Sequence, residues 1–483
     1  MNKKLVFGIT GRLLEALGII MLLPMVVSVI YKELSSVFAF LVTAFISFII
    51  GFVLRAVTRN RSNVLYAKEG FLIVALAWLS TSFIGCLPFV ISGEIPSLVD
   101  AFFETASGFT TTGASILTDV EALSHGMLFW RSFTHWIGGM GVLVFIIAFI
   151  SNDSERSIHI LRAEMPGPTV GKLVPRSKDT SKVLYIIYIG ITLLQIILLF
   201  AGGMPLFESV LHSFGTAGTG GFGVKSDSIA SYSPYCQWVI AVFMFIFSIN
   251  FNLYFLLIIK RWKNVLKSTE LWTFVAIVFI STALITTDLS IDTGFFSVDT
   301  LRHAFFQVNT IASTTGYSSV DFNLWPSLSK SILFILMFIG GCAGSTAGGL
   351  KLSRVIILFK MIKKEIKQMI HPRAVATVKL EGKEVDSHSQ RSVATYFAVY
   401  MICLILIFFI LSVLEPFDFE SLFTASSACF NNVGPGFGIV GPLGSYAAFT
   451  DASKILLSIA MIFGRLEIFP ILIALIPSTW RKH

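Results

Sequence analysis

The stretch that decides the fold is DAFFETASGFTTTGAS, residues 100–115, because three related stretches occur elsewhere in the same chain. All four mix aromatic with small polar side chains and then reach a short peptide centred on glycine. The other three are PLFESVLHSFGTAGTGGFG (205–223), DTLRHAFFQVNTIASTTGYS (299–318) and DFESLFTASSACFNNVGPGFG (418–438). Aligning the peptides places Gly113, Gly221, Gly316 and Gly434 in register, so the chain contains a fourfold internal repeat.

Composition places these repeats in a membrane protein. Of the 483 residues, 55% are hydrophobic and 13% are charged, and the mean hydropathy is +0.81. A soluble globular chain carries about 25% charged residues. The polar surface is therefore too small for a cytoplasmic enzyme, a nucleic-acid-binding protein or a secreted disulfide scaffold. The five cysteines have no CxxC or CxxH spacing and indicate neither a metal site nor a disulfide framework.

Ten segments are apolar and long enough to cross a hydrocarbon core of about 30 Å as helices. The first carries Arg12 and Glu15 and has no small-residue cleavage site, so we expect a retained helix and not a signal peptide. The eighth is interrupted by glycines. The ten segments are 5–30, 34–54, 71–91, 126–150, 183–203, 236–259, 271–287, 331–359, 393–414 and 455–479.

Lysine and arginine are concentrated on one set of loops. The loops 55–68, 151–182, 260–269 and 351–391 hold 24 of them. The loops 92–125, 204–235, 288–330 and 415–454 hold only four. The positive-inside rule places the first set, and with it both termini, in the cytoplasm. The formal charge of +8 is thus a topology signal and does not indicate nucleic-acid binding.

Spans and repeats together predict an all-α polytopic membrane protein with pseudo-fourfold symmetry. It has ten transmembrane helices, one of them broken, and four re-entrant half-length helices that enter from the outer side. We expect an N-terminal two-helix segment and four pore repeats, the third of which contains an intramembrane glycine loop. Their predicted bounds are 1–69, 70–150, 151–269, 270–370 and 371–483.

Four extended peptides around one axis predict a path for a cation. Non-helical backbone at membrane depth is tolerated where it is buried in protein or lines a watery path. Backbone carbonyls can replace the hydration shell of an ion, and a neutral carbonyl ring favours a monovalent over a divalent cation. The half-helices would point their partially negative ends inward and begin near Asp100, Glu208, Asp299 and Asp418. Six acids would concentrate cations at the outer mouth: Glu94, Asp119, Glu121, Asp227, Asp292 and Asp321.

At these motifs the sequence resembles the potassium-translocating subunits of the Trk/Ktr/HKT superfamily, most closely its TrkH branch. The resemblance covers nearly the whole chain, including the two spans that precede the first repeat. The motifs are TTTGAS (110–115), STTGYSS (313–319), NNVGPGFG (431–438), GGCAGSTAGGLK (340–351), RAEMPGP (162–168) and GRLE (464–467).

The resemblance implies a gated potassium uptake protein, not an enzyme, with potassium as the transported ligand and no cofactor in this chain. It implies a homodimer in a bacterial plasma (inner) membrane, under the control of TrkA-type cytoplasmic nucleotide-binding regulatory subunits. The implied filter residues are Thr111, Thr112, Gly113, Thr219, Gly220, Gly221, Thr314, Thr315, Gly316, Asn432, Val433 and Gly434.

Two features bear on ion preference. In this superfamily a serine at the first filter glycine accompanies sodium permeability, and Gly113 stands there, which favours potassium. The second and fourth copies depart from the TTG pattern, so the implied filter is a ring of unlike peptides.

Residues 340–349 are the first gate candidate. Gly344 and Gly349 have the spacing of a phosphate-binding loop, but Leu350 stands where its lysine belongs. We expect an irregular segment below the filter that obstructs the path, with Gly344, Ser345, Thr346 and Gly348 as its movable part. A glycine-rich helix contact or hinge is the alternative.

Arg465 is the second gate candidate, because a cation near the membrane centre normally faces a cavity or a partner. The resemblance favours a pore-facing charge that repels cations, and a structural ion pair with Glu467 or another acid is the alternative. Arg131 lies nearer the outer surface, where it can snorkel, so a structural role is expected. Lys360, Lys363, Lys364 and Lys367 extend from the glycine segment to where a cytoplasmic regulator could pull.

Three rival functions remain. A secondary symporter typically has twofold inverted repeats, which differ from this fourfold one-sided pattern. A membrane-embedded enzyme would need clustered catalytic residues, whereas His135, His212 and His303 are scattered. A potassium-binding subunit of an ATP-driven pump would share this architecture, and any ATP hydrolysis would then lie on another chain.

Overall fold

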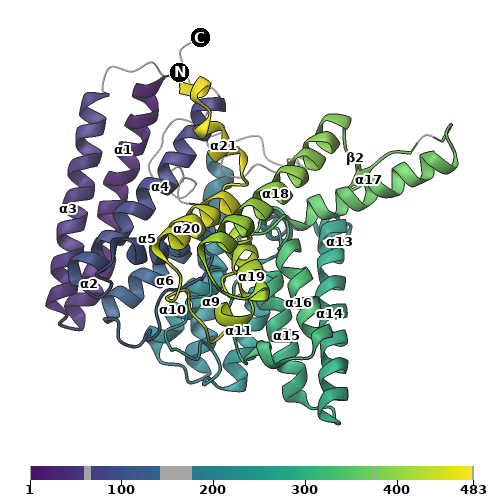
Figure 1. Cartoon of the computed structure of the whole chain (residues 1–483), viewed down its shortest axis with the longest axis horizontal. Helices are drawn as coiled ribbons and strands as arrows, with labels where there is room; N and C mark the ends of the chain where they lie inside the picture. The colour runs from purple at the N-terminus through teal and green to yellow at the C-terminus, as the bar shows by residue number, and fades with distance from the viewer. Residues whose placement is uncertain (1, 59–66, 142–176, 375, 481–483) are drawn as a thin grey trace.

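The computed structural model describes residues 2–58, 67–141, 177–374 and 376–480. The chain forms a bundle of long helices that runs from the N-terminal α1 and α3 on one side to α14–α16 on the other (Figure 1). The prediction of an all-α polytopic membrane protein is confirmed. The last nine residues of the fourth predicted span (142–150), the basic loop up to 176 and the RAEMPGP motif (162–168) lie outside the described residues.

Within the described residues, six helical segments are long and apolar enough to cross a membrane. They expose large apolar side chains along their length, as Phe38 (64% exposed) and Phe45 (64%) of α3 do, which suits contact with lipid. The six are α1 with α2 (Lys3–Ile20, Leu22–Ile30), α3 (Leu34–Val57), α4 (Ala67–Ser92), α9 (Ser177–Ala201), α14 (Thr269–Thr293) and α18 (Ser387–Leu414).

In the described part of the chain, three of the ten predicted spans are broken, whereas the sequence predicted a break in only one of them. The expected break separates α16 (Ser327–Ile339) from α17 (Leu352–Ile370). The sixth span is split into α11 (Pro234–Phe247) and α12 (Phe251–Ile258), which are bent by 89°. The tenth is split into α20 (Asp451–Arg465) and α21 (Phe469–Leu475), bent by 120°.

Polar residues and strained backbone account for the two unexpected breaks. After α11, the Asn250 side chain accepts a hydrogen bond from the Asn252 amide and starts a new helix, α12. After α20, Glu467 and Ile468 both adopt positive φ angles (55° and 68°), and Pro470 lies in the first turn of α21. Hydropathy alone does not reveal such breaks, because the residues on both sides of each break are apolar.

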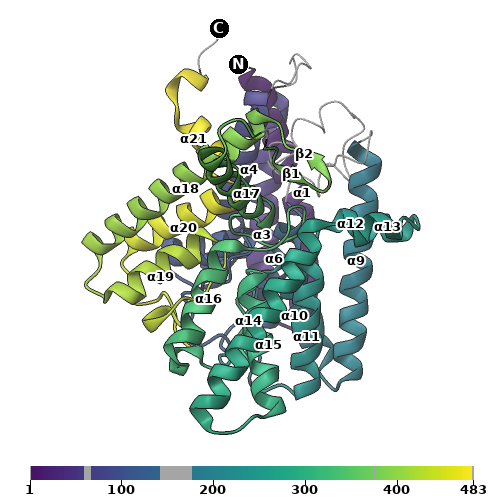
Figure 2. The same ribbon diagram turned by 90° about the vertical axis from the view of Figure 1, so that its right-hand side faces the viewer.

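Four half-length helices lie between the long ones. They are α5 (Leu98–Phe109), α10 (Leu206–Gly218), α15 (Val298–Ala312) and α19 (Phe419–Phe430). Figure 2 shows α18–α20 on one side of the bundle and α9 on the other. An acid lies at the start of each half-helix, as predicted: Asp100, Glu208 and Asp299 in the first turn, and Asp418 as the N-cap.

The described residues also form several further helices and turns and one hairpin. A further helix, α6 (His125–Gly139), follows the first half-helix, and α13 (Trp262–Leu266) precedes α14. A two-stranded antiparallel hairpin, β1 (Lys379–Leu380) and β2 (Lys383–Glu384), connects α17 to α18. The 3-10 turns are η1 (Phe322–Leu324), η2 (Gly438–Val440) and η3 (Pro477–Trp480). α1 begins and η3 ends at the same end of the bundle (Figure 1).

The N-terminal pair α1 and α3 packs backbone against backbone through two glycines. A Cβ at Gly51 would lie 2.5 Å from the Gly11 carbonyl oxygen, and one at Gly11 would lie 2.7 Å from the Gly51 carbonyl oxygen. Real Cβ atoms do not approach this closely, so both positions require glycine for the helices to meet.

We expect Gly51→Ala to lower the thermal stability of the detergent-solubilised protein, because overpacking costs about 1–3 kcal/mol. Gly190→Ala on α9 is the matched control, since a Cβ there meets nothing within 4 Å. Unfolding temperatures of the two variants would be compared with the parent chain. Equal stability of Gly51→Ala and the parent would contradict the close contact between α1 and α3.

Candidate functional site

The peptides that follow the four half-helices share one backbone conformation. We call the tripeptides 111–113, 219–221, 314–316 and 432–434 the ring peptides. The first residue of each has a φ angle in the left-handed region: 56° at Thr111, 56° at Thr219, 57° at Thr314 and 55° at Asn432. Non-glycine residues rarely adopt this conformation, so its recurrence at four positions indicates four equivalent backbone paths.

The third residue of each ring peptide is a glycine with positive φ: 80° at Gly113, 78° at Gly221, 86° at Gly316 and 93° at Gly434. A side chain at these positions would meet the carbonyl oxygen of the middle residue of another ring peptide. The Cβ-to-oxygen distances would be 2.1 Å from Gly113 to Gly220, 1.9 Å from Gly221 to Thr315, 2.2 Å from Gly316 to Val433 and 2.5 Å from Gly434 to Thr112.

These contacts run from the first peptide to the second, third and fourth, and return to the first. The cycle closes only if the four peptides surround one axis. The structure therefore brings together all twelve residues of the ring peptides, from segments more than 300 positions apart in the sequence.

All four ring glycines line one cavity of about 190 Å³. The cavity is continued by the loops that follow the first, second and fourth ring peptides, including Ser115, Gly223 and Tyr446. Its charged lining residues are Arg131 and Lys225. The six acids that the sequence predicted at the mouth do not line this cavity. Glu94, for example, is bound to Ser36 and Ser124.

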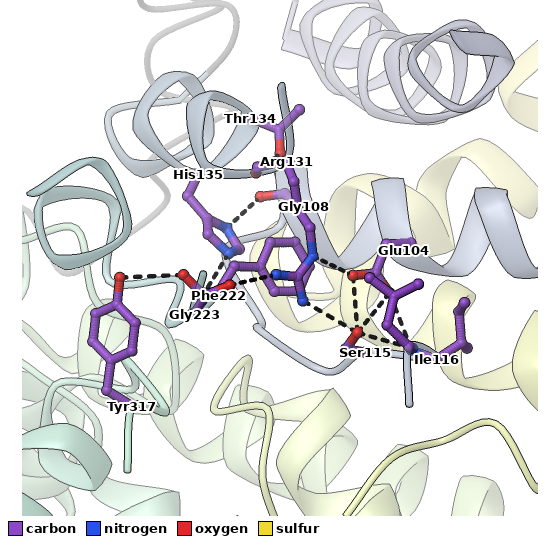
Figure 3. Close-up of polar contacts among 11 residues, drawn as sticks. Glu104, Gly108, Ser115, Ile116, Arg131, Thr134, His135, Phe222, Gly223 and Tyr317 are labelled. Carbon is purple, nitrogen blue, oxygen red and sulfur yellow. Dashed lines mark hydrogen bonds and ion pairs between the residues drawn. The ribbon is translucent and has the colours of Figure 1, made fainter. Parts of the chain in front are cut away.

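A buried ion pair lies beside the first and second ring peptides (Figure 3). Arg131 of α6 and Glu104 of α5 lie 2.6 Å apart, with side chains 3% and 0% exposed. The arginine also donates to the Gly223 carbonyl (2.9 Å), while its guanidinium carbon lies 3.6 Å from the centre of the Phe222 ring. The contacts of Arg131 are those of a structural residue, as the sequence predicted. Its side chain, however, pairs with the buried Glu104 and does not extend to the surface.

Further hydrogen bonds fix the ring, both within the fourth repeat and between the fourth and first repeats. Tyr446 donates to the Gly434 carbonyl (2.9 Å). The Asn432 amide donates to the Thr112 hydroxyl (3.0 Å) and to the Met461 carbonyl (2.8 Å). At the start of α19, hydrogen bonds from Ser421 hold the pKa of Asp418 below its usual range, so this acid is anionic at neutral pH.

The segment 340–349, which we call the glycine loop, lies directly against two ring peptides. The Gly348 amide donates to the Thr314 hydroxyl (2.6 Å), and the Gly349 amide donates to the Asn431 carbonyl (3.1 Å). A Cβ at Gly348 would lie 2.5 Å from the same Asn431 oxygen. The glycine loop therefore touches the third and fourth repeats at the base of the ring.

The other predicted gate residues tie the glycine loop to the broken sixth span. The Phe251 amide donates to the Gly344 carbonyl (3.0 Å), and the Thr346 hydroxyl donates to the Phe247 carbonyl (3.2 Å). Ser345 bonds within the loop, to the Cys342 carbonyl (2.7 Å). The glycine loop thus packs against the break between α11 and α12, which the sequence analysis did not predict. The polar residues Ser248 and Asn250 within an apolar run could have indicated this break.

Arg465 connects the glycine loop to the first repeat. It is the last residue of α20, at the second missed break, and donates to the Thr346 carbonyl (2.8 Å). It also donates to the carbonyls of Gly138 (2.6 Å) and Gly139 (2.7 Å) at the end of α6. Glu467, its predicted alternative partner, is paired instead with Arg354 at the start of α17.

Known proteins are similar in sequence to this protein along its whole length. The TrkH family, described as a cation transport protein, matches residues 36–482. The Trk system potassium uptake protein TrkH of Salmonella typhimurium is 36% identical and TrkG of Escherichia coli is 35% identical, over 100% and 99% of both chains.

A solved structure agrees as well. The crystal structure of the potassium transporter TrkH from Vibrio parahaemolyticus has a TM-score of 0.89 and 32% identity, with full coverage of both chains. The predicted family resemblance and the prediction that the chain is not an enzyme are both confirmed. The chain belongs to the TrkH family of cation transport proteins.

Proposed function

We propose that this chain conducts potassium ions into a bacterial cell through the axis of the four ring peptides. The closed cycle of glycine-to-carbonyl contacts carries the proposal, because it places four equivalent carbonyl-bearing peptides around one axis. Carbonyl oxygens arranged in this way replace the water around a monovalent cation. The relatives are named potassium uptake proteins, which supports potassium as the cargo.

The twelve residues of the ring peptides form the proposed selectivity filter, and each repeat contributes one wall. The division of the chain into an N-terminal pair of helices and four pore repeats belongs to this proposal. The membrane is the bacterial plasma membrane, with the basic loops and both termini in the cytoplasm. The transported ion is the ligand, and no cofactor is needed in this chain.

The glycine loop and Arg465 form the proposed gate. Three hydrogen bonds from one guanidinium hold Thr346 of the loop to the end of α6. The arrangement places a positive charge beneath the ring and joins three repeats. Gly344 and Gly349 have positive φ angles, which gives the loop backbone conformations that other residues resist. Opening then consists of the loop leaving Arg465 and the base of the ring.

α17 is the proposed connection to the regulatory partner. It continues directly from the glycine loop and projects from the bundle beyond α14 (Figure 1). Four lysines lie along it, and the Lys360 amine donates to the Lys379 carbonyl of the hairpin (2.7 Å). A TrkA-type regulatory subunit that binds this region would move the helix that ends at the gate.

The proposed homodimer also involves α17. Phe359, Ile362, Ile366 and Met369 are 52–78% exposed and form a stripe at helical spacing. An apolar stripe on a projecting helix suits the surface of a second copy.

The filter is tested by Gly316→Ser. A Cβ at Gly316 would lie 2.2 Å from the Val433 carbonyl oxygen at a φ of 86°, so the neighbouring carbonyl must move. We expect the ratio of potassium to sodium flux in proteoliposomes to fall by roughly tenfold, a change of about 1.4 kcal/mol. Flux of potassium down its gradient without ATP or a proton gradient would separate a conduit from a pump subunit or a symporter.

Gly294→Ser is the matched control for this variant. Gly294 has a similar φ of 78° but nothing within 4 Å of a Cβ, so it carries the backbone strain without the ring contact. Its selectivity should equal that of the parent chain. An unchanged flux ratio in Gly316→Ser, or no preference for potassium in the parent chain, would count against the filter.

Arg465→Ala tests the gate. Two unit charges about 4 Å apart repel by ~4 kcal/mol at an effective dielectric constant of ~20, so losing even part of this barrier raises flux roughly tenfold or more. We expect higher basal potassium flux, whereas Arg465→Lys, which keeps the charge, stays near the parent value. Equal or lower flux in folded Arg465→Ala protein would assign the arginine a bracing role alone.

Neutralising Lys360, Lys363, Lys364 and Lys367 to glutamine tests the regulatory connection. We expect binding of a purified TrkA-type subunit to weaken and regulated flux to fall to the basal level, because the charges would pair with acids on the partner. Lys263→Gln in the exposed α13, combined with Lys267→Gln at its C-cap, is the control. Binding and regulation that survive the fourfold change would remove α17 from the proposal.

A further inference from the structure

The second ring peptide differs from the other three in its middle residue. That residue is Thr112 in the first peptide, Thr315 in the third and Val433 in the fourth, but Gly220 in the second. Gly220 and Gly221 follow each other, so this peptide has no side chain at either position. Two consecutive glycines make the backbone especially flexible. This flexibility is unfavourable where the backbone carbonyls must stay oriented towards one axis.

Backbone conformation does not explain the glycine at 220. The positive φ angles of this peptide belong to Thr219 and Gly221, and Gly220 is not among the residues with positive φ. Packing explains it instead, since the three atoms closest to a Cβ at Gly220 all belong to His135. They are its Cγ at 2.2 Å, its Nδ1 at 2.2 Å and its Cε1 at 2.5 Å. The imidazole occupies the space that a threonine or valine side chain would use.

The imidazole is itself held at both nitrogens (Figure 3). Its Nδ1 lies 2.8 Å from the Gly108 carbonyl oxygen, which can only accept, so Nδ1 carries the proton. Its Nε2 then accepts a hydrogen bond from the Phe222 amide at 3.3 Å. The ring is fully buried and packs on the Phe222 ring, with centroids 4.2 Å apart.

The residue after Gly221 is therefore fixed from two neighbouring repeats. His135 of the first repeat accepts from the Phe222 amide, and Tyr317 of the third repeat donates to the Phe222 carbonyl at 3.3 Å. Gly108, which anchors the imidazole, belongs to the half-helix that leads into the first ring peptide. His135 thus links the first ring peptide to the second.

We propose that His135 is a positioning residue of the ion path that replaces the missing side chain of Gly220 and holds the second ring peptide in register. The proposal rests on the proposed function, because its consequence is ion selectivity. His135 touches no ion; it acts through the backbone of residues 220–222. The pair His135 and Gly220 forms one unit, in which the large residue on α6 requires the small residue in the ring.

The test uses three variants of the full chain in proteoliposomes, with potassium, rubidium and sodium flux as the readout. In His135→Ala the second peptide loses its support, and we expect the potassium-to-sodium ratio to fall roughly tenfold, the effect of one lost hydrogen bond of ordinary strength. Adding Gly220→Thr to His135→Ala recreates the pattern of the first and third peptides, and we expect the ratio to recover. Gly220→Thr alone has no space and should perturb selectivity at least as much as His135→Ala.

Phe40→Ala is the control for general loss of packing. Phe40 is fully buried on α3, so its truncation creates a cavity without touching the ring, and selectivity should stay at the parent value. Recovery in the double variant is the readout that a purely structural histidine would not give. Thermal stability of each variant, measured in detergent, shows that the compared proteins are folded.

The outcomes separate this inference from the proposed function. A parent chain without preference for potassium overturns both. A selective parent chain whose His135→Ala variant keeps the same ratio overturns the positioning role and leaves the proposed function standing. A double variant that is no more selective than His135→Ala alone overturns the replacement of one side chain by the other.

Discussion

The structure depends on one recurring contact, in which the α-carbon of a ring glycine packs against a carbonyl oxygen of the next ring peptide. Four such contacts form a closed cycle, so each peptide is in place only when both neighbours are. A side chain on any of the four glycines would collide with main-chain atoms, which cannot turn away as a flexible side chain can. The backbone of the ring is thereby fixed by the whole chain and not by any single repeat.

The elements around the ring supply what the peptides cannot supply themselves. Non-helical backbone at membrane depth has no water to satisfy its polar groups, so side chains from the surrounding helices and loops must bond to it. Tyr446 bonds to the fourth peptide's glycine, Arg131 to the loop after the second, and His135 and Tyr317 to Phe222. The buried Glu104 offsets the charge of Arg131, which would otherwise be costly to bury in an apolar interior.

The same logic joins the ring to the glycine loop. The loop donates two amide hydrogen bonds to the third and fourth repeats, and Arg465 ties the loop to the end of α6. Two helix breaks create this arrangement: one exposes backbone next to Gly344 and Cys342, and the other ends α20 at Arg465. Because α17 leaves directly from the loop, displacement of this helix would act on contacts that lie beside the ring.

The sequence by itself determined the membrane class, the apolar segments, the four repeats and the residues of the ring peptides, because hydropathy and aligned glycines are local patterns. It also singled out Arg465 and the glycine loop, since a charge and a run of glycines are conspicuous in apolar surroundings. Only the tertiary structure decided the breaks after Phe247 and Arg465, the pairing of Glu467 with Arg354, and the exclusion of a side chain at Gly220 by His135. These features arise from contacts between residues far apart in the chain, and no pattern within one segment records which distant atom will occupy the neighbouring space.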